Sequence, residues 1–559
     1  MNGIESKLIS YLKIVLKEDK IFLETLSESQ QGDAALPCFK YAKKLKKNPK
    51  IIAEEIRSTI EKNKPEFLEK VQAAGGYVNF YYNRTMVMEN IIKEVLVKGE
   101  GYGASMIGKN KKALIEHTSI NPNASPHIGR ARNALIGDFL VRLMNFQGYQ
   151  VETQYFVNDV GKQIAMLVLA GKNKEQVLFK DLLEEYIQIN RKMETDPNLE
   201  KQVFELLNKL EKNDKGVRER FKNVVDICIK GQTEILNKLG IHYDIFQYES
   251  DYIFNNRIDE LLEAFRRIDK LEEDEHSRLY LDLEDFDLPM KSPSLVLTRN
   301  DKTSLYPLRD IAYTIDKVNT NSELNIVVLG EDQKLYFKQI CAALQILGHE
   351  TPQAVHYSFV LLKEGKMSTR KGTVVLLEDF MQEAVDKAIK YMLRNQQDVD
   401  QRTAEAVAYG AVKYAILKVD NNRNVTFDLE SALSFEGDTG PYLQYCCARI
   451  HSIFNKLQEP LPRDGNLELL VKEEEYELIK ELGRFEETIK KAAADYSSHF
   501  LANYIYKLAR KFSLFYHQCP VLTCNDEELK TARLLVLKAT LQVLTTGMYL
   551  LGMEEVQSM

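Results

Sequence analysis

The stretch KALIEHTSINPNASPHIGRARNALIGDFLVRLMNFQGYQVETQYFV, residues 112–157, decides the fold. A short apolar run at 113–115 is followed by turn-forming residues, a helical segment over about 130–147 and a second apolar run at 151–157. Short apolar runs that alternate with helices are typical of parallel strands joined by crossover helices. The stretch therefore predicts a strand, a loop, a helix and a second strand parallel to the first.

The same pattern continues along the chain. Apolar runs at 325–329 and 360–362 predict further strands of this sheet, and 374–377 is also strand-like. Between these groups, about 171–300 is highly charged and largely helical, which predicts an insertion packed beside the sheet. From about residue 400 onward the periodicity is helical throughout, which predicts an all-α C-terminal domain.

The first hundred residues have a different pattern. Residues 4–16 and the region from Ala42 have helical spacing, Tyr77–Tyr82 alternates as a strand does, and GEGYGAS at 99–105 predicts a flexible joint. Six lysines lie between residues 40 and 50. They form either a solvated helix face or a set of contacts for a phosphate backbone.

The net charge does not mark a nucleic-acid-binding protein. The 559 residues hold 75 Lys and Arg against 82 Asp and Glu, which gives −7. The distribution is uneven, because residues 1–170 are net positive whereas 271–290 hold eight acidic side chains against one arginine. Charge along the chain is therefore compatible with an RNA partner.

The sequence also predicts the compartment and the absence of a metal site. No apolar run approaches the ~18 residues of a membrane span, and charged residues interrupt the N-terminal segment, so we expect a cytoplasmic protein without membrane contact. Seven scattered cysteines suit reduced thiols. Cys519 and Cys524 have no second pair at zinc-site spacing, so we expect no zinc and no dedicated metal site.

One candidate phosphate site follows the first predicted strand. The chain has neither GxxxxGK[ST] nor GxGxxG, so phosphate binding needs another device. A loop that opens a helix would place an imidazole and backbone N–H groups where phosphate is favoured, and a glycine there lets the backbone approach a ligand. For one His-x-Gly alone, a structural turn is the stronger interpretation. The residues concerned are Pro126, His127, Ile128, Gly129 and Arg130.

A second candidate is the glycine-bounded loop GKMSTRKG at 365–372, which carries three cations and a serine. Such a loop can fold over a triphosphate and neutralise the charge that develops on leaving pyrophosphate. An exposed polar connection explains the loop equally well when it is taken alone. The candidates in it are Lys366, Met367, Ser368, Arg370 and Lys371.

Together and in this order, HIGR and KMSTR resemble the HIGH and KMSKS signatures of class I aminoacyl-tRNA synthetases. The flanking motifs narrow the resemblance to the arginyl-tRNA synthetase family, and it covers nearly the whole chain. Similar to that family are EHTSINPN, RNALIGD, YFVNDVGKQI, LYPLRD, MSTRKGT, GAVKYAIL and FEGDTGPYLQYCCARI, with QGDAALPCFKYAKKLKKNP and GGYVNF resembling its appended N-terminal domain.

The resemblance implies three domains in an α/β protein. A Rossmann-like parallel-sheet catalytic domain would span 101–400 with the helical insertion at about 171–300, a small α/β domain over 1–100 would bind the tRNA elbow, and an all-α domain over 401–559 would bind the anticodon. Each aromatic candidate in the last domain can equally be packing within a bundle. The candidate contacts to tRNA(Arg) are Lys43, Lys44, Lys47, Tyr442, Tyr445 and Arg449.

The implied activity is arginine–tRNA ligation in two steps. L-arginine attacks ATP to give arginyl-adenylate, and the arginyl group then passes to the 3′ end of tRNA(Arg), with activation dependent on bound tRNA. Positioning and charge stabilisation would carry catalysis, Mg²⁺ would travel with ATP, no organic cofactor is needed, and we expect a monomer. The implied catalytic residues are His127, Gly129, Arg130, Lys366, Ser368, Arg370 and Lys371; ATP would contact Pro126 to Arg130 and Lys366 to Ser368.

The resemblance also implies an arginine subsite. A guanidinium is a planar fork of donors that pairs with carboxylates, and the resemblance assigns that role to Glu116 and Asp310, with Tyr306 beside them. Asn121 matches the position that holds the substrate's α-amino or carboxylate end, and Gln333 is a weaker match to the same pocket. Taken singly, these residues could be surface carboxylates, a turn asparagine and a helix cap.

The sequence departs from the family pattern at both signatures. Arg130 stands in place of the last His, and Thr369 in place of a Lys. In members with the second change, a Lys just ahead of HIGH is thought to compensate, but Ala124 occupies that place here. We expect Arg130 to substitute electrostatically, with Lys366, Arg370 and Lys371 as further candidates for the missing charge.

These departures leave an alternative open: a paralogue that binds tRNA or arginine but activates it weakly. A general HIGH-type nucleotidylyltransferase would not explain the appended helical domain.

Overall fold

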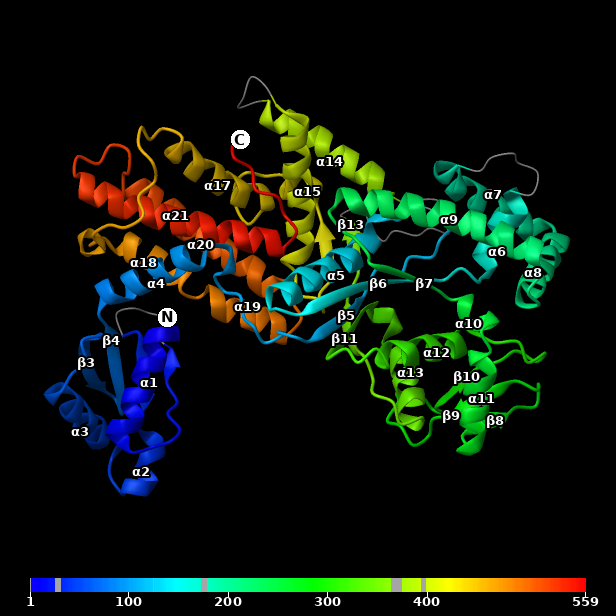
Figure 1. Cartoon of the computed structure of the whole chain (residues 1–559), viewed down its shortest axis with the longest axis horizontal. Coiled ribbons are helices and arrows are strands. Elements are labelled where there is room, and N and C mark those ends of the chain that lie inside the picture. Colours follow the sequence, from blue (N-terminus) through cyan, green and yellow to red (C-terminus); the bar gives the residue numbers. More distant parts are fainter. Residues whose placement is uncertain (1, 26–31, 124, 172–177, 363–374, 394–398) are drawn as a thin grey trace.

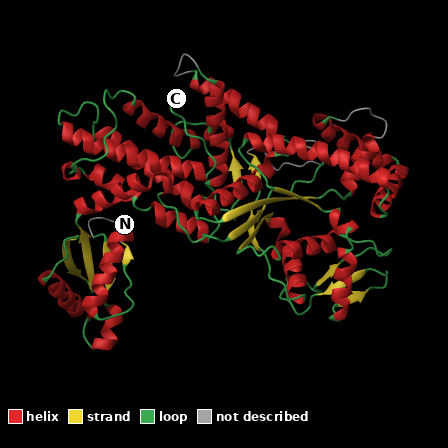
Figure 2. Cartoon of the chain, viewed as in Figure 1, coloured by secondary structure: helices red, strands yellow, loops and turns green. Residues whose placement is uncertain are grey.

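The computed structural model describes residues 2–25, 32–123, 125–171, 178–362, 375–393 and 399–559. Figure 1 shows a central sheet with a helical bundle on one side, a small N-terminal unit beyond the bundle and the insertion on the other side. Figure 2 shows that helices dominate and that strands gather in separate small groups. Within the residues just given, no helix is both long and apolar enough to cross a membrane.

The central sheet has five strands in the order β12-β11-β5-β6-β7, and every neighbouring pair is parallel. The chain runs outward from β5 to β6 and β7, then returns to the other side for β11 and β12. Ligands bind at the carboxyl ends of strands where the order reverses, here beside β5. The strands are β5 (Lys112–Glu116), β6 (Gln150–Val157), β7 (Ile245–Tyr248), β11 (Leu324–Gly330) and β12 (Gln353–Tyr357).

The strands predicted at 113–115, 151–157 and 325–329 are confirmed, but two other predictions are wrong. The run at 360–362 is a strand, β13 (Val360–Leu362), yet it pairs with β14 (Val425–Phe427) and not with the central sheet. Of the run at 374–377, residue 374 lies outside the described residues, Leu376 forms a single antiparallel bridge with His127, and Leu377 opens a helix, α14 (Leu377–Met392). Short apolar runs do not specify their pairing partner, so periodicity alone could not separate these cases. Periodicity also missed β12.

Helix α5 (Ile128–Phe146) joins the sheet to the helical bundle. It packs on β5, β6 and β11 and also contacts α14, α15 (Gln401–Leu417) and α19 (Phe485–Ala494), so it is buried along nearly its whole length. The guanidinium of Arg132, fully buried, donates to the carbonyl oxygens of Ser358 and Arg423 at 2.7 Å each and of Asp420 at 2.8 Å. The first turns of α5 are thereby fixed to the segment just after β12 and to the segment just before β14.

The insertion is helical as predicted, but it also contains strands. One of them, β7, completes the central sheet, and three others form an antiparallel sheet in the order β10-β9-β8, which holds part of the acidic stretch. Charged residues on the exposed strand faces obscured the alternation. The elements are α6 (Lys162–Ala170), α7 (Leu182–Thr195), α8 (Pro197–Glu211), α9 (Lys215–Lys238), α10 (Asp251–Phe254), α11 (Arg257–Arg267), β8 (Leu271–Glu273), β9 (Leu279–Asp282) and β10 (Ser294–Val296), followed by α12 (Tyr306–Val318) and α13 (Lys334–Ile346).

The N-terminal unit is an antiparallel sheet in the order β1-β2-β4-β3 with three helices. Its buried Asp33 accepts a hydrogen bond from the Tyr82 N–H at 2.9 Å and forms an ion pair with Lys480 of the bundle at 2.7 Å. The unit is therefore docked through a buried ion pair. Its elements are α1 (Asn2–Leu16), β1 (Glu24–Thr25), β2 (Ala34–Pro37), α2 (Phe39–Leu45), α3 (Pro49–Lys62), β3 (Leu68–Ala74) and β4 (Tyr77–Tyr82).

The flexible joint predicted at 99–105 is wrong. Helix α4 (Arg84–Lys98) packs against the bundle, and the ring of Tyr102 stacks on Phe485 with centroids 5.9 Å apart. A Cβ on Gly103, at φ +85°, would lie 2.6 Å from the same Phe485 ring. The glycine therefore serves a close contact, which the sequence cannot distinguish from mobility.

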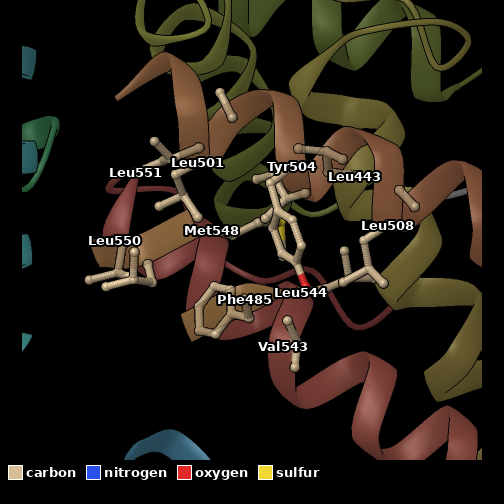
Figure 3. Close-up of a cluster of buried hydrophobic side chains, with 14 of the residues drawn as sticks. Leu443, Phe485, Leu501, Tyr504, Leu508, Val543, Leu544, Met548, Leu550 and Leu551 are labelled. Atoms are coloured by element: carbon tan, nitrogen blue, oxygen red, sulfur yellow. The ribbon is translucent and has the colours of Figure 1, made fainter. Parts of the chain in front are cut away.

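The C-terminal domain is a helical bundle, as predicted. The periodic segment at 473–518 comprises three helices, and Figure 3 shows the side chains that the last helices bury between them, including Phe485, Leu508 and Leu544. The elements are α15 (Gln401–Leu417), α16 (Leu429–Ala432), α17 (Gly440–Phe454), α18 (Glu473–Leu482), α19 (Phe485–Ala494), α20 (His499–Gln518) and α21 (Glu527–Leu550).

Candidate active site

A cavity of about 620 Å³ opens at the carboxyl ends of β5, β6 and β11 and is closed on one side by α12 and α13. This is the crevice that the reversal of strand order predicts. All five residues proposed for the arginine subsite line it, although they span more than 200 positions of the chain, and so does Arg130 of the first signature. The five are Glu116, Asn121, Tyr306, Asp310 and Gln333.

Glu116 is the last residue of β5, and its side chain is buried. One carboxylate oxygen, Oε2, forms a buried ion pair with the ammonium of Lys317 from α12. The other, Oε1, receives a longer contact of 3.5 Å from the hydroxyl of Ser119. Burial of a carboxylate is costly unless it is paired, and the ion pair with Lys317 offsets that cost for Glu116.

Asp310 lies on α12 and faces the same cavity. The hydroxyl of Tyr336 donates to its Oδ2 at 2.7 Å. Burial raises the pKa of the Asp310 carboxyl and the nearby Glu116 acts in the same direction, while Tyr336 and Lys317 oppose the rise. The exposed ring of Tyr306 lies 5.2 Å from that of Tyr336. Two carboxylates and two rings thus line one recess.

A third carboxylate in the cavity was missed from the sequence. Glu249, just after β7, is 4% exposed and accepts a hydrogen bond from Nε of Arg309 at 2.6 Å. Burial raises the pKa of Glu249 to about 6, which the Arg309 charge partly offsets. The insertion is rich in acidic residues, so nothing in the local sequence set this one apart.

The two amide side chains lie at the rim of the cavity. Oδ1 of Asn121 accepts a hydrogen bond from Asn158 at 3.1 Å, and its Nδ2 donates to Gln163 at 3.2 Å, so the loop after β5 is tied to the segment after β6. Gln333 is the N-cap residue of α13, but within the described residues its side chain caps no backbone N–H. Helix capping therefore does not explain Gln333.

The loop between Glu116 and Asn121 has an unusual backbone. Thr118 and Ser119 have φ of +74° and +39°, a region that a β-branched residue rarely adopts. The Thr118 N–H donates to Oδ1 of Asn133 on α5, and the Ile120 N–H donates to the hydroxyl of Tyr155 on β6 at 2.9 Å. Such strain persists where surrounding contacts over-determine the conformation, and it is common at functional sites.

His127 is the N-cap residue of α5, with an extended backbone. Its Nδ1 is buried and has no hydrogen-bond partner among the described residues. Burial, and then the charge of Arg130, lower the pKa of His127 to about 4. The imidazole is therefore neutral at neutral pH, and the permanent cation of the HIGR signature is Arg130.

The second signature falls outside the described residues. These exclude 363–374, and with them Lys366, Met367, Ser368, Arg370 and Lys371. The chain just after that range pairs with the first signature. The Ile128 N–H donates to the Val375 carbonyl at 3.2 Å, and the Leu377 N–H donates to the Pro126 carbonyl at 2.8 Å. Gly129 lies in the first turn of α5, next to these bonds.

The lysines proposed to contact RNA lie on the surface of the N-terminal unit. Lys44 pairs with Glu18 at 2.5 Å and Lys47 with Glu55 at 2.6 Å, and Lys43 is exposed. Exposed pairs of this kind contribute little to stability, so their ammonium groups can exchange partners at low cost.

The candidates on α17 divide into two kinds. The Tyr442 hydroxyl shares a hydrogen bond of 2.8 Å with the Ser513 hydroxyl, which makes this residue part of the bundle packing. The guanidinium of Arg449 lies 4.5 Å from the ring of Tyr445 and 4.8 Å from that of Tyr516. Both Tyr445 and Tyr516 are partly accessible, so this stack presents flat surfaces to solvent.

Among the residues that the structure describes, no group of three or more His, Cys, Asp or Glu side chains is arranged to hold a metal ion.

Three family models match the chain in succession. The model for "Arginyl tRNA synthetase N terminal domain" matches residues 2–82, that for "tRNA synthetases class I (R), catalytic domain" matches 91–429, and that for "DALR anticodon binding domain" matches 443–559. Curated relatives agree. An arginine–tRNA ligase of Methanocaldococcus jannaschii is 38% identical, with 98% of each chain covered. One of Halothermothrix orenii is 34% identical, with 97% of this chain and 96% of the other covered.

Solved structures give the same result. The arginyl-tRNA synthetase of Thermus thermophilus superposes with a TM-score of 0.83 at 26% identity, covering 99% of this chain and 100% of the other. That of Plasmodium falciparum shares the fold, with a TM-score of 0.80 at 21% identity and coverage of 100% and 99%.

The parallel sheet, the crevice at its carboxyl ends and the catalytic-domain match define a class I aminoacyl-tRNA synthetase. The domain before the sheet and the domain after it then narrow the class. The chain belongs to the arginyl-tRNA synthetase family. None of these comparisons supports a weakened paralogue.

Proposed function

We propose that the protein activates L-arginine with ATP and transfers the arginyl group to the 3′ end of tRNA(Arg). The observation that carries the proposal is the convergence of Glu116, from the end of β5, and Asp310, from α12, on one recess beside Tyr306. Paired carboxylates next to an aromatic ring suit a planar guanidinium better than a point-like ammonium. Asn121 and Gln333, at the rim of the recess, would hold the backbone end of the amino acid.

The proposed chemistry needs no protein nucleophile. The arginine carboxylate attacks the α-phosphorus of ATP and pyrophosphate leaves, so the protein accelerates the step by positioning the reactants and stabilising charge. His127, neutral at neutral pH, would hydrogen-bond the triphosphate, and Arg130 would supply the cation at the helix N-terminus. Mg²⁺ would arrive with ATP. The candidates that would meet the pyrophosphate are Lys366, Ser368, Arg370 and Lys371.

The two flanking domains would hold the tRNA. The lysines of α2 and the turn after it would contact the RNA backbone, and the Tyr445–Arg449–Tyr516 stack would provide surfaces for unpaired bases. We also propose that the domain limits lie at about residues 100 and 400 and that activation depends on bound tRNA. We further propose that the protein is a monomer and that it is cytoplasmic.

The test is arginine-driven exchange of label between pyrophosphate and ATP, measured with and without tRNA(Arg). We expect exchange with arginine and tRNA together, followed by arginylation of the tRNA. If no exchange occurs even with tRNA present, the proposed activity is wrong. Faster exchange with another amino acid would instead overturn the specificity.

A further inference from the structure

Lys317 is a buried cation inside the proposed arginine subsite, and neither signature nor flanking motif gives it a role. It lies on the last turn of α12, is 4% exposed and lines the same cavity as Glu116 and Asp310. Its ammonium pairs with Oε2 of Glu116 and lies 4.5 Å from the centroid of the Tyr313 ring. A buried cation is therefore already paired with one of the two carboxylates proposed to receive the substrate's guanidinium.

The charges of Glu116, Asp310 and Lys317 indicate a role for the Lys317 ammonium. Glu116 and Asp310 together supply two negative charges, and Lys317 offsets one of them, so one net negative charge faces one guanidinium. Lys317 pairs with Oε2 of Glu116, Oε1 has the long contact with Ser119, and the Tyr313 hydroxyl also hydrogen-bonds the Glu116 carboxylate. Oε1 and the Asp310 carboxylate are thus placed to receive the donors of a planar fork.

Other charged groups line the wider cavity: Arg130 of the first signature, Asp332, and Lys162, which pairs with Glu200 at 2.6 Å. The balance therefore concerns the groups around the Lys317–Glu116 pair. Glu249 is compensated by Arg309, and Tyr313, Tyr336 and Cys341 are neutral at neutral pH because burial raises the pKa of each. The titratable or charged groups that face the Lys317–Glu116 pair from the elements packed around it are Asp310 and Tyr313 on α12, Tyr336 and Cys341 on α13, and Glu249 with its partner Arg309.

Removal of the ammonium would leave two carboxylates on one cavity without their shared cation. The charge of Glu116 already raises the pKa of Asp310, and Lys317 opposes that rise, so without Lys317 one carboxyl group would hold a proton at a higher pH than in the wild type. A protonated carboxyl pairs less well with a guanidinium. Arginine binding would then have to release a proton, a linkage that a merely structural lysine would not create.

We propose that Lys317 is a specificity-determining residue of the arginine subsite. Its ammonium keeps Glu116 and Asp310 ionised together, and the one net negative charge that remains matches the single positive charge of a guanidinium. This inference rests on the proposed function, because it assumes that the cavity binds arginine.

The test is the pH profile of the arginine KM in tRNA arginylation, from about pH 6 to pH 8.5, for Lys317→Gln and Lys317→Met. In the wild type we expect the KM to rise on acidification as the Asp310 carboxyl, whose pKa is raised by burial, takes up a proton. In both variants we expect this rise to begin about one pH unit higher, because an opposite charge within a few ångströms ordinarily lowers a carboxyl pKa by 1–3 units. Below that pH the KM should increase by up to about tenfold per unit, as release of one proton requires.

Two further variants separate charge from packing. Lys317→Arg retains the cation and should retain the wild-type profile. Lys480→Met removes another buried ion pair, with Asp33 at 2.7 Å, neither partner of which lines the cavity, and should not move the profile. A uniformly higher KM in Lys317→Gln and Lys317→Met, with the acid rise at its wild-type position, would overturn the proposal and leave Lys317 a structural role. Lys317→Gln keeps a hydrogen-bond donor for Glu116, so it decides the question if Lys317→Met does not fold.

Failure of this inference is distinguishable from failure of the subsite itself. Asp310→Asn in the otherwise wild-type protein should raise the arginine KM at neutral pH. If it does, and the Lys317 variants keep the wild-type profile, only the role of Lys317 is wrong. If Asp310→Asn leaves the KM unchanged, the cavity is not the arginine subsite and the inference fails with it.

Discussion

The cavity at the sheet and the lysine surface of the N-terminal unit use charge in opposite ways. In the cavity, Glu116 and Lys317 are buried and form one specific pair. On the N-terminal surface, the side chains of Lys44 and Lys47 are 68% and 48% exposed, with partners that solvent can replace. Buried charges give specificity because each depends on a particular partner, whereas exposed charges attract any phosphate backbone and are screened by salt.

The largest loss of activity should come from removing the charge of a carboxylate in the cavity. Asp310→Asn removes a buried charge that we propose to pair with the guanidinium, so kcat/KM for arginine should fall about 100-fold, the equivalent of roughly 3 kcal/mol. Steady-state arginylation kinetics measure it. Asp316→Asn, on the same helix but 41% exposed and paired with Arg257, should change kcat/KM less than about twofold. Equal losses of kcat/KM in the two variants would contradict the prediction that the buried carboxylate matters more for activity than the exposed one.

The second-largest loss of activity should come from a change at Arg130, because this residue lines the cavity yet remains partly accessible. Arg130→Ala should lower kcat for ATP–pyrophosphate exchange by about tenfold to 100-fold, since a preorganised donor to the phosphates is lost. Arg130→His should change the rate by less than about tenfold, because both residues can donate to phosphate. If Arg130→His activates a nearly inactive protein, Arg130 is not a working substitute and the weakened paralogue becomes the better description.

A change in the accessible Tyr445–Arg449–Tyr516 stack should have an effect of intermediate size, and only on the interaction with tRNA. Tyr445→Ala should raise the KM for tRNA about tenfold, because a stacked base is worth roughly 1–3 kcal/mol, and leave the arginine KM unchanged. Tyr442→Phe removes only the hydroxyl bonded to Ser513, so it should leave the tRNA KM unchanged and lower the stability by about 1 kcal/mol. Arginylation kinetics and denaturant unfolding measure both. A larger tRNA effect from Tyr442→Phe would reverse this assignment.

The smallest effect should come from one exposed lysine. Lys43→Ala should weaken tRNA binding about twofold to threefold at moderate salt and make its logarithmic dependence on salt concentration shallower by up to about one. Filter binding at several salt concentrations measures the slope. Lys209→Ala, on the exposed face of α8 in the insertion, is the comparison and should leave it unchanged. Identical slopes for Lys43→Ala and the wild type would remove Lys43 from the RNA contact.

The sequence pattern was sufficient to predict an element where neighbouring residues alone determine its structure. Ala113–Ile115 and Val151–Val157 were recognisable as strands because parallel strands are buried on both faces and have continuous apolar runs. Val360–Leu362 had the same kind of run but paired with β14, since strand pairing depends on segments 65 residues away. The stretch at 99–105 looked mobile because glycine marks both flexibility and close contact, and only the position of Phe485 distinguishes them.

By itself, the sequence determined the class of fold, the two signatures and the identity of the residues that now line the cavity, because these depend on periodicity and on collinear motifs. Only the tertiary structure decided that Lys317 pairs with Glu116 across 201 residues, and that Glu249 enters the same cavity compensated by Arg309. The reason is physical. The role of a buried charge depends on its partner, and the fold selects that partner by bringing α12 to Glu116 at the end of β5 and to Glu249 just after β7.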